Sequence, residues 1–212
     1  TYPMEYLCLD IKYIYVHADR RNYYLLTILD VFSRRTVDQI FQKSIRQMDV
    51  INAFRRIQQQ YGIKGVTIRN DNGSQFIANS VKQYLRAAEA NQEFTHVATP
   101  EENSYIEAFH SIVQREVVDR YEFDSFYHAK HVLAAHRSWY DNRRNHRMIG
   151  MIPREKWEQN IHITEAKREL LRVEETASIS AIKNNQELEY PDEKLQLNSN
   201  NYYTTNSQIL SN

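Results

Sequence analysis

Three acidic residues, Asp10, Asp71 and Glu107, have the side chains and the spacing that could support metal-dependent chemistry. Asp10 lies in the middle of residues 6–16, an apolar and aromatic stretch that predicts a strand. A carboxylate within such a strand is unfavourable unless it is paired, hydrogen-bonded or bound to metal. The alternative for Asp10 alone is an acid on the solvated face of an edge strand.

Asp71 follows residues 66–70, a short apolar stretch that predicts another strand, and precedes an Asn-Gly turn. We expect Gly73 to allow a positive φ in this turn and Ser74 to cap the following helix. In open sheets with helices around them, ligands collect at the carboxyl ends of strands, which is where Asp71 stands. Considered alone, the same residues could be a turn and nothing more.

Glu107 borders the apolar stripe of a helical pattern over residues 104–118. If the first strand lies beside the fourth, Asp10 and Asp71 project from neighbouring strands, and this helix could bring Glu107 to the same point. Three carboxylates so close together repel one another unless cations compensate their charge. Hard oxygen ligands without thiols favour Mg²⁺ or Mn²⁺, and two ions about 3.5–4 Å apart can catalyse phosphodiester chemistry.

The remaining periodicity predicts an α/β fold around a five-stranded mixed sheet. Residues 6–16, 23–32 and 33–41 predict three antiparallel strands, and a helix over 47–61 leads to a parallel fourth strand. A helix over 74–90, a strand over 93–97 and helices over 104–118 and 125–144 complete a domain of residues 1–160. Residues 161–212 are expected to form an appendage or partly ordered tail, with a helix near 165–173 and a hairpin near 188–197.

Composition limits the classes of protein that the chain can represent. Its 212 residues are 42% hydrophobic, and its 27 basic and 27 acidic residues balance, although residues 1–160 carry a net charge of +3. The single Cys8 excludes an intrachain disulfide and fits a reduced, cytoplasmic setting. Neither a membrane-spanning stretch nor a signal peptide is predicted. Because the chain begins without Met, we expect it to be a piece of a longer protein.

Four motifs in this order resemble the catalytic core of retroviral-type integrases and insertion-sequence transposases of the Asp-Asp-Glu type. They are LDVFSR at 29–34, DNGSQF at 71–76, NSYIEAF at 103–109 and WYDNRRNH at 139–146. The resemblance covers residues 5–160 and implies a ribonuclease-H-like fold. It also implies DNA cleavage and strand transfer at transposon ends in the bacterial cytoplasm or nucleoid, by homo-oligomers assembled on DNA. Asp10, Asp71 and Glu107 would then be the catalytic residues and the ligands of two Mg²⁺ or Mn²⁺ ions.

The chain departs from that pattern at three places. Gln114 stands where such transposases usually carry Lys or Arg, with Arg115 beside it, and Lys12 stands where Thr is common. The resemblance also implies an N-terminal helix-turn-helix region that binds the transposon end, and we expect that region to be missing from this sequence. Two alternatives therefore stay open: a ribonuclease-H-like nuclease that only hydrolyses, and an inactive DNA-binding or assembly domain, which Gln114 favours.

Cationic and amide side chains near these motifs are the candidates for DNA contacts, because each cation placed near a phosphate releases a counterion. They are Lys12, Gln75, Asn103, Arg115, Arg143, Arg144, His146 and Arg147. Cations after a helix are also favoured by the helix dipole, which is the structural alternative for residues 143–147. Asp30, Glu101 and Glu102 are rival acids, and Glu102 is the one that would replace Glu107 if that assignment is wrong.

Three aromatic or imidazole side chains near the motifs have a structural interpretation. We expect Trp139 and Tyr140 to pack in the core rather than to stack on bases. His110, three residues after Glu107, could approach the metal site, but we expect a solvated or core-edge histidine.

Overall fold

The computed structural model of the protein describes residues 1–95 and 103–189. The chain divides into two compact units, Thr1–Arg168 and the part that begins at Glu169. Among the described residues, none of the helices combines the length and the apolar character that crossing a membrane requires. The first unit contains the sheet and all the predicted site residues.

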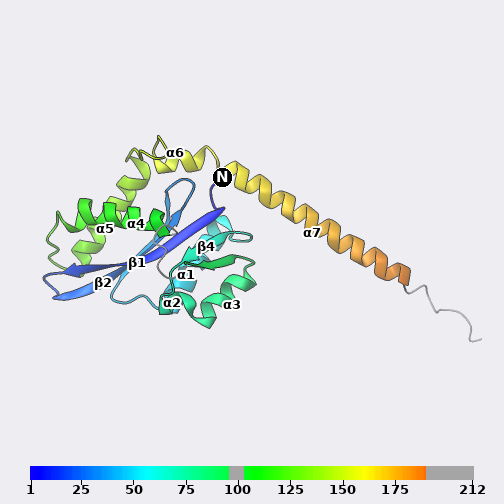
Figure 1. The fold of residues 1–212 in the computed structure, drawn as a ribbon, viewed down its shortest axis with the longest axis horizontal. Coiled ribbons are helices and arrows are strands. Elements are labelled where there is room, and N and C mark those ends of the chain that lie inside the picture. The colour runs from blue at the N-terminus through cyan, green and yellow to red at the C-terminus, as the bar shows by residue number, and fades with distance from the viewer. Residues whose placement is uncertain (96–102, 190–212) are drawn as a thin grey trace, which may run out of the picture. The chain divides into compact units, whose positions relative to one another are not determined.

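A five-stranded mixed sheet forms the centre of the first unit, as predicted (Figure 1). Its strands are β1 (Tyr6–Val16), β2 (Arg21–Asp30), β3 (Thr36–Gln42), β4 (Thr67–Asn70) and β5 (Asn91–Phe94), in the order β3-β2-β1-β4-β5. Strand β2 pairs antiparallel with both β1 and β3, whereas β4 pairs parallel with both β1 and β5. The predicted placement of the first strand beside the fourth is confirmed.

Helices connect and cover the strands. They are α1 (Gln47–Tyr61), α2 (Ser74–Ile77), α3 (Asn79–Ala87), α4 (Ser104–Val113), the π-helix η2 (Gln114–Val118), α5 (Phe126–Asn142), α6 (Pro153–Glu158) and α7 (Ile161–Glu189). Helix α1 has the predicted bounds and ends at Gly62, whose φ of +71° suits glycine.

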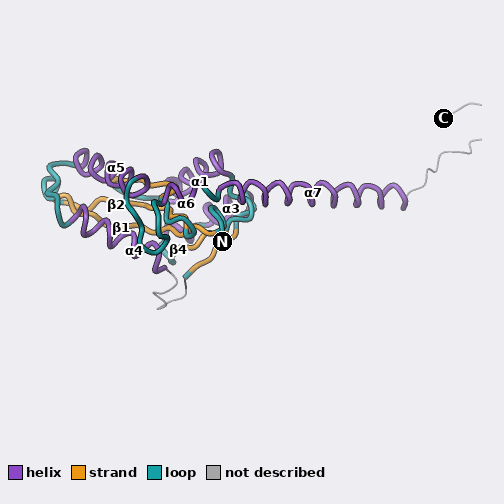
Figure 2. Tube along the Cα trace, turned by 90° about the horizontal axis from the view of Figure 1, so that it is seen from above, coloured by secondary structure: helices purple, strands orange, loops and turns teal. Residues whose placement is uncertain are grey.

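Two apolar cores lie on opposite faces of the sheet, because side chains alternate along each strand. Leu7 and Leu9 of β1 belong to the core that α1 and α3 cover. Cys8 and Ile14 belong to the core that α4 and α5 cover. Figure 2 shows the strands running through the middle of this unit with helices around them. Asp10 has the same parity as Cys8, so its side chain is on the α4 face.

Two predicted helices differ from the observed ones in their regularity. The helix predicted over 74–90 is broken at Ala78, where φ is −56° and ψ is 134°, so that α2 and α3 are separate. The helix predicted over 104–118 continues α4 into the π-helix η2. Single π turns inside α-helices often occur at functional sites.

Toward the C-terminus the helix predicted near 165–173 is part of the longer α7. Of the hairpin predicted near 188–197, residues 188–189 belong to α7, so the prediction is wrong there, and the rest lies outside the described residues. The end of the predicted fifth strand and the loop 99–102 also lie outside them. The predicted boundary after residue 160 stays a prediction.

Candidate active site

Asp10 lies in β1, and Asp71 directly follows the neighbouring parallel strand β4, which ends at Asn70. The pairing of β1 with β4 runs through Leu7 with Ile68 and Cys8 with Arg69. Continuing this register by two residues along each chain would set Asp10 across from Asp71, and the carboxylate of Asp10 is close enough to raise the pKa of Asp71. The turn after β4 therefore brings together two acids that are far apart in the sequence, as expected.

The electrostatics of Asp71 reflect this arrangement. Burial raises the pKa of Asp71, the neighbouring carboxylate of Asp10 raises it further, and a hydrogen bond from the Gly73 amide opposes both. That amide lies 2.9 Å from Oδ1 of Asp71. The two acids thus repel each other across the strand pair, and a cation between them would remove the repulsion.

Gly73 leaves space for two neighbouring side chains. Its φ is −57°, so this turn does not use the positive φ that a glycine would allow. A Cβ at this position would lie 2.5 Å from Nε2 of Gln75 and 2.9 Å from Oδ1 of Asp71. Ser74 does not cap α2 either, because Gly73 is the N-cap residue. The glycine lets the Gln75 amide fold back over the turn that carries Asp71.

Helix α4 places a histidine, His110, next to Asp10. Nδ1 of His110 lies 3.3 Å from Oδ2 of Asp10, and His110 is 7% exposed. We expected His110 to be a solvated or core-edge residue, but it is buried against Asp10. A signal for this contact was present in the sequence, since His110 follows Glu107 by three residues and shares a helix face with it.

Glu107 is exposed, one turn before His110 in α4. Within residues 1–95 and 103–189, no group of three or more His, Cys, Asp or Glu side chains could hold a metal ion. The structure brings Asp10 close to Asp71 and, separately, to His110, and the role of Glu107 as a third metal ligand stays a prediction. The donor set of Asp10 and Asp71, two hard carboxylates that repel each other, fits Mg²⁺ or Mn²⁺.

Comparison with known families agrees with this arrangement. Two family profiles, both described as integrase core domain, match residues 1–100 and 88–153. The chain belongs to the integrase core family. It is 26% identical over 135 residues to an uncharacterised 31.7 kDa protein of insertion element IS407 from Burkholderia multivorans, covering 64% of this chain and 48% of that protein. It is 22% identical over 134 residues to the transposase for insertion sequence element IS904 from Lactococcus lactis, covering 62% of this chain and 53% of that transposase. The chain thus spans about half the length of these relatives.

Solved structures show the same fold. The catalytic core domain of BIV integrase superposes with a TM-score of 0.60 at 12% identity, covering 76% of this chain and 99% of that domain. The catalytic core domain of HTLV-2 integrase in complex with magnesium superposes with a TM-score of 0.57 at 13% identity, covering 73% and 96%. The ribonuclease-H-like fold implied by the sequence motifs is confirmed.

The two departures near the acids of this integrase core lie close to one another. Gln114 donates a hydrogen bond of 2.7 Å from Nε2 to Oδ1 of Asp119. Lys12 is half-buried on the same face of β1 as Asp10; burial lowers the pKa of Lys12, and the carboxylates of Asp119 and Asp10 oppose that shift. A cation is therefore present beside Asp10, although position 114 lacks one.

The predicted amide contacts differ in their surroundings. Gln75 is half-buried beside the turn that carries Asp71. Asn103, at the N-cap of α4, is 8% exposed, and its Oδ1 has no hydrogen-bond partner among the described residues. An unpaired buried acceptor at the start of the helix that carries Glu107 is compatible with a polar ligand.

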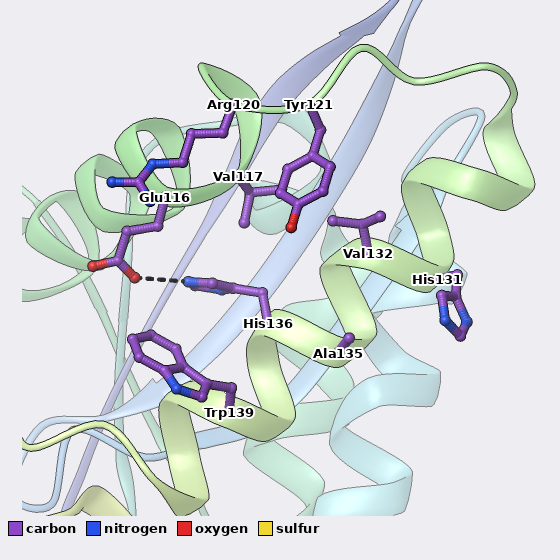
Figure 3. A pocket seen from close by; sticks show the side chains of 9 residues that line it. All are labelled: Glu116, Val117, Arg120, Tyr121, His131, Val132, Ala135, His136 and Trp139. Carbon is purple, nitrogen blue, oxygen red and sulfur yellow. Dashed lines mark hydrogen bonds and ion pairs between the residues drawn. The ribbon is translucent and has the colours of Figure 1, made fainter.

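Arg144, one of the basic residues predicted to contact DNA, lies beside a separate cavity of the integrase core. A cavity of 560 Å³ between η2 and α5 is lined by Glu116, His136 and Trp139 among other residues (Figure 3). Nε2 of His136 lies 3.0 Å from Glu116, and the guanidinium of Arg144 lies 3.1 Å from the same carboxylate. Arg144 is thus held by an acid.

The other basic residues predicted to contact DNA are more accessible to a ligand. Arg115, Arg143 and Arg147 are exposed, and His146 is half-buried with no hydrogen-bond partner at Nδ1. Burial lowers the pKa of His146, and the charges of Arg34 and Arg144 lower it further. Tyr140 packs in the core as expected, but Trp139 is 42% exposed, so the expectation that it is buried was wrong.

Asp30 is the one rival acid that lies within the described residues, and its carboxylate is occupied by other contacts. Asp30 is fully buried and accepts hydrogen bonds from the amide of Met4 and from the amide and hydroxyl of Ser33, at 2.8, 2.7 and 2.6 Å. Glu101 and Glu102 lie outside the described residues. Asp30 therefore stabilises the turn of the LDVFSR motif.

Proposed function

We propose that this integrase core is the catalytic part of an insertion-element transposase, which cleaves DNA phosphodiesters at transposon ends and joins them to target DNA. The observation that supports this proposal is the proximity of Asp10 and Asp71 on two adjacent parallel segments of the chain, since the carboxylate of Asp10 raises the pKa of Asp71. The mutual repulsion of the two carboxylates would favour the binding of hard cations between them.

Asp10 and Asp71 would hold the divalent cations, and Glu107 would complete the second site from α4. Bound Mg²⁺ or Mn²⁺ would activate the attacking oxygen and neutralise charge on the phosphoryl group. In the first reaction water attacks a phosphodiester at the transposon end and releases a 3′-hydroxyl. In the second reaction that hydroxyl attacks a phosphodiester of the target, and the new leaving oxygen departs in line.

The residues proposed to contact DNA would position the substrate over these acids. Lys12 is the cation beside Asp10. Gln75 lies in α2, directly after the turn that contains Asp71, and Asn103 is the N-cap residue of the helix that carries Glu107. Arg115, Arg143, Arg147 and His146 would contact phosphates further away, and Arg144 would do so while bound to Glu116. Mutating such a phosphate contact weakens binding for all sequences alike and reduces its salt dependence.

The assembly is proposed by analogy. The HTLV-2 integrase core has been solved in trimeric and dimeric forms, and the related integrase of simian T-cell lymphotropic virus in an intasome. We propose that this chain likewise acts as a homo-oligomer on DNA in the bacterial cytoplasm.

A strand-transfer assay tests the proposal. The 212-residue chain is incubated with a target plasmid, Mg²⁺ or Mn²⁺, and a pre-cleaved oligonucleotide copied from the DNA that flanks its gene. Joined products are expected, and Asp71→Asn should reduce them by about 10³-fold or more. Asp124→Asn is the matched control, because Asp124 is an acid whose side chain is 87% exposed. Cleaved but unjoined DNA would favour a nuclease that only hydrolyses, and cleavage that survives Asp71→Asn would contradict the metal role of Asp71.

A further inference from the structure

His110 is the one basic group that the structure records in direct contact with either acid of the Asp10 and Asp71 pair within the described residues. Its side chain is 9% exposed, and that of Asp10 is 25% exposed. The contact joins Nδ1 of the imidazole to Oδ2 of the carboxylate. It also joins two elements, since His110 belongs to α4 and Asp10 belongs to β1.

The carboxylate of Asp10 is thereby held at both oxygens. Its Oδ1 accepts a hydrogen bond of 2.7 Å from the amide of Ile11, and its Oδ2 faces Nδ1 of His110 at 3.3 Å. An ionised carboxylate has about four acceptor positions, so each oxygen keeps one for a further ligand. A group fixed in this way cannot rotate freely and presents its remaining lone pairs in one direction.

The other ring nitrogen of His110 shows that the contact is not a product of packing alone. Nε2 is buried and has no hydrogen-bond partner among the described residues. The ring of His110 lies 6.1 Å from the ring of Phe109, measured between the ring centroids. An apolar side chain would fill this space without an unpaired polar atom, which is unfavourable when buried. The polarity of His110 therefore serves Asp10.

We infer that His110 is a positioning residue for Asp10, with its Nδ1–H directed at Oδ2 so that the carboxylate is oriented for a divalent cation. This inference rests on the proposed function. It assigns the neutral tautomer with the proton on Nδ1, which leaves Nε2 as a bare acceptor. Hydrogen bonds from a neighbouring side chain to a metal-binding carboxylate typically change metal affinity by about 10- to 100-fold.

The position of His110 in α4 gives this contact a second consequence. Glu107 precedes it by one helical turn on the same face of α4. The contact with Asp10 therefore fixes the segment of α4 from which Glu107 would reach the cations. Losing the imidazole would disturb two of the three proposed ligands at once.

Three substitutions separate positioning from packing. His110→Asn places an amide nitrogen near the position of Nδ1, and His110→Gln places it near the position of Nε2. His110→Leu removes both nitrogens and keeps an apolar side chain. Each full-length variant is titrated with MnCl₂ alone in a calorimeter. We expect the Leu and Gln variants to bind Mn²⁺ about 10-fold more weakly than the wild type, and the Asn variant to bind within about threefold of it.

The outcomes distinguish this inference from the proposed function. Asp10→Asn is the reference for Asp10-dependent binding. If the wild type binds Mn²⁺ no better than Asp10→Asn, the proposed function is overturned and the role of His110 with it. If the wild type binds better than Asp10→Asn but His110→Leu matches the wild type, the role of His110 alone is overturned. An Asn variant as weak as the Leu variant would also overturn it, because the position of Nδ1 would then have no influence.

Discussion

Asp30 and Asp10 lie on neighbouring strands of one sheet, and their carboxylates have opposite surroundings. Asp30 is fully buried, and three donors from Met4 and Ser33 occupy its oxygens. Asp10 is partly exposed and accepts one backbone hydrogen bond, with His110 beside it and Asp71 opposite. The difference teaches that an acid that stabilises the fold is both buried and supplied with several hydrogen-bond donors, whereas an acid that is open to a cation is partly exposed and has few donors.

Asp141 belongs with Asp30 in this comparison. It is 6% exposed, and its Oδ1 accepts a hydrogen bond of 2.9 Å from the amide of Thr36, whose hydroxyl also donates to Asp141. The acid near the end of α5 is thereby joined to the start of β3. Two of the four motifs that resemble the transposase family thus contain acids that are saturated with hydrogen bonds.

Removing the saturated carboxylate should produce the largest change in stability. Asp30→Ala leaves three buried donors without an acceptor, and we expect the free energy of unfolding to fall by about 3–5 kcal/mol. Asp10→Ala is the matched control on the adjacent strand. It should lower the free energy of unfolding by less than about 1 kcal/mol, because the amide of Ile11 is the one backbone donor that would lose its acceptor. Urea titration measures both variants. Equal losses would remove the distinction between the two acids.

The Glu116 cluster is an intermediate case, because Glu116 is partly exposed but has two cationic partners. Burial raises the pKa of Glu116, hydrogen bonds from His136 and Arg144 lower it, and the net shift is downward from 4.5. A lowered pKa in the folded state means that the ionised acid stabilises the protein above the unfolded pKa. This stability is lost as the pH falls through the folded pKa.

We therefore expect Glu116→Gln to lower the free energy of unfolding by about 1–2 kcal/mol at neutral pH and by less at pH 3. Urea unfolding at the two pH values measures the change. Glu158→Gln is the control, since its ion pair with Arg154 is more than half exposed on both sides. A pH-independent effect of Glu116→Gln would show that packing, not charge, is responsible.

The smallest expected change in stability concerns Asp71, and it is a gain rather than a loss. The pKa of Asp71 is raised by burial and by Asp10, so its ionised form is less favourable in the folded than in the unfolded chain. Asp71→Asn should therefore stabilise the chain by about 0.5 kcal/mol at neutral pH without divalent cations, a value kept small because Asp71 is half-buried. The gain should fade as the pH decreases through the folded pKa and vanish below the unfolded value of 3.8. Thermal unfolding in the presence of a chelator tests this prediction. If Asp71→Asn were less stable than the wild type, Asp71 would be an acid that stabilises the fold, as Asp30 is.

Local patterns predicted the framework of the sheet and the strand positions of both aspartates. Alternation along residues 6–16 and the helical period over 47–61 gave β1 and α1 their bounds, since both signals depend on neighbouring residues. The saturation of Asp30 could not be predicted, because the amide of Met4 is distant in the sequence. The burial of His110 against Asp10 likewise depends on the packing of α4 on β1. The break at Ala78 has no helix-breaking residue to announce it.

The π-helix at residues 114–118 has a consequence for how this helix is compared with others. A π turn holds one residue more than an α turn, so side chains beyond it are rotated by roughly 100° relative to a regular helix. In a regular helix, residues seven apart lie on the same face. This spacing therefore relates Glu107 to Gln114, but it does not predict the direction of the side chains from Arg115 to Arg120. Deleting one residue from this segment would restore the regular helix and turn Glu116 away from the partners that now hold it.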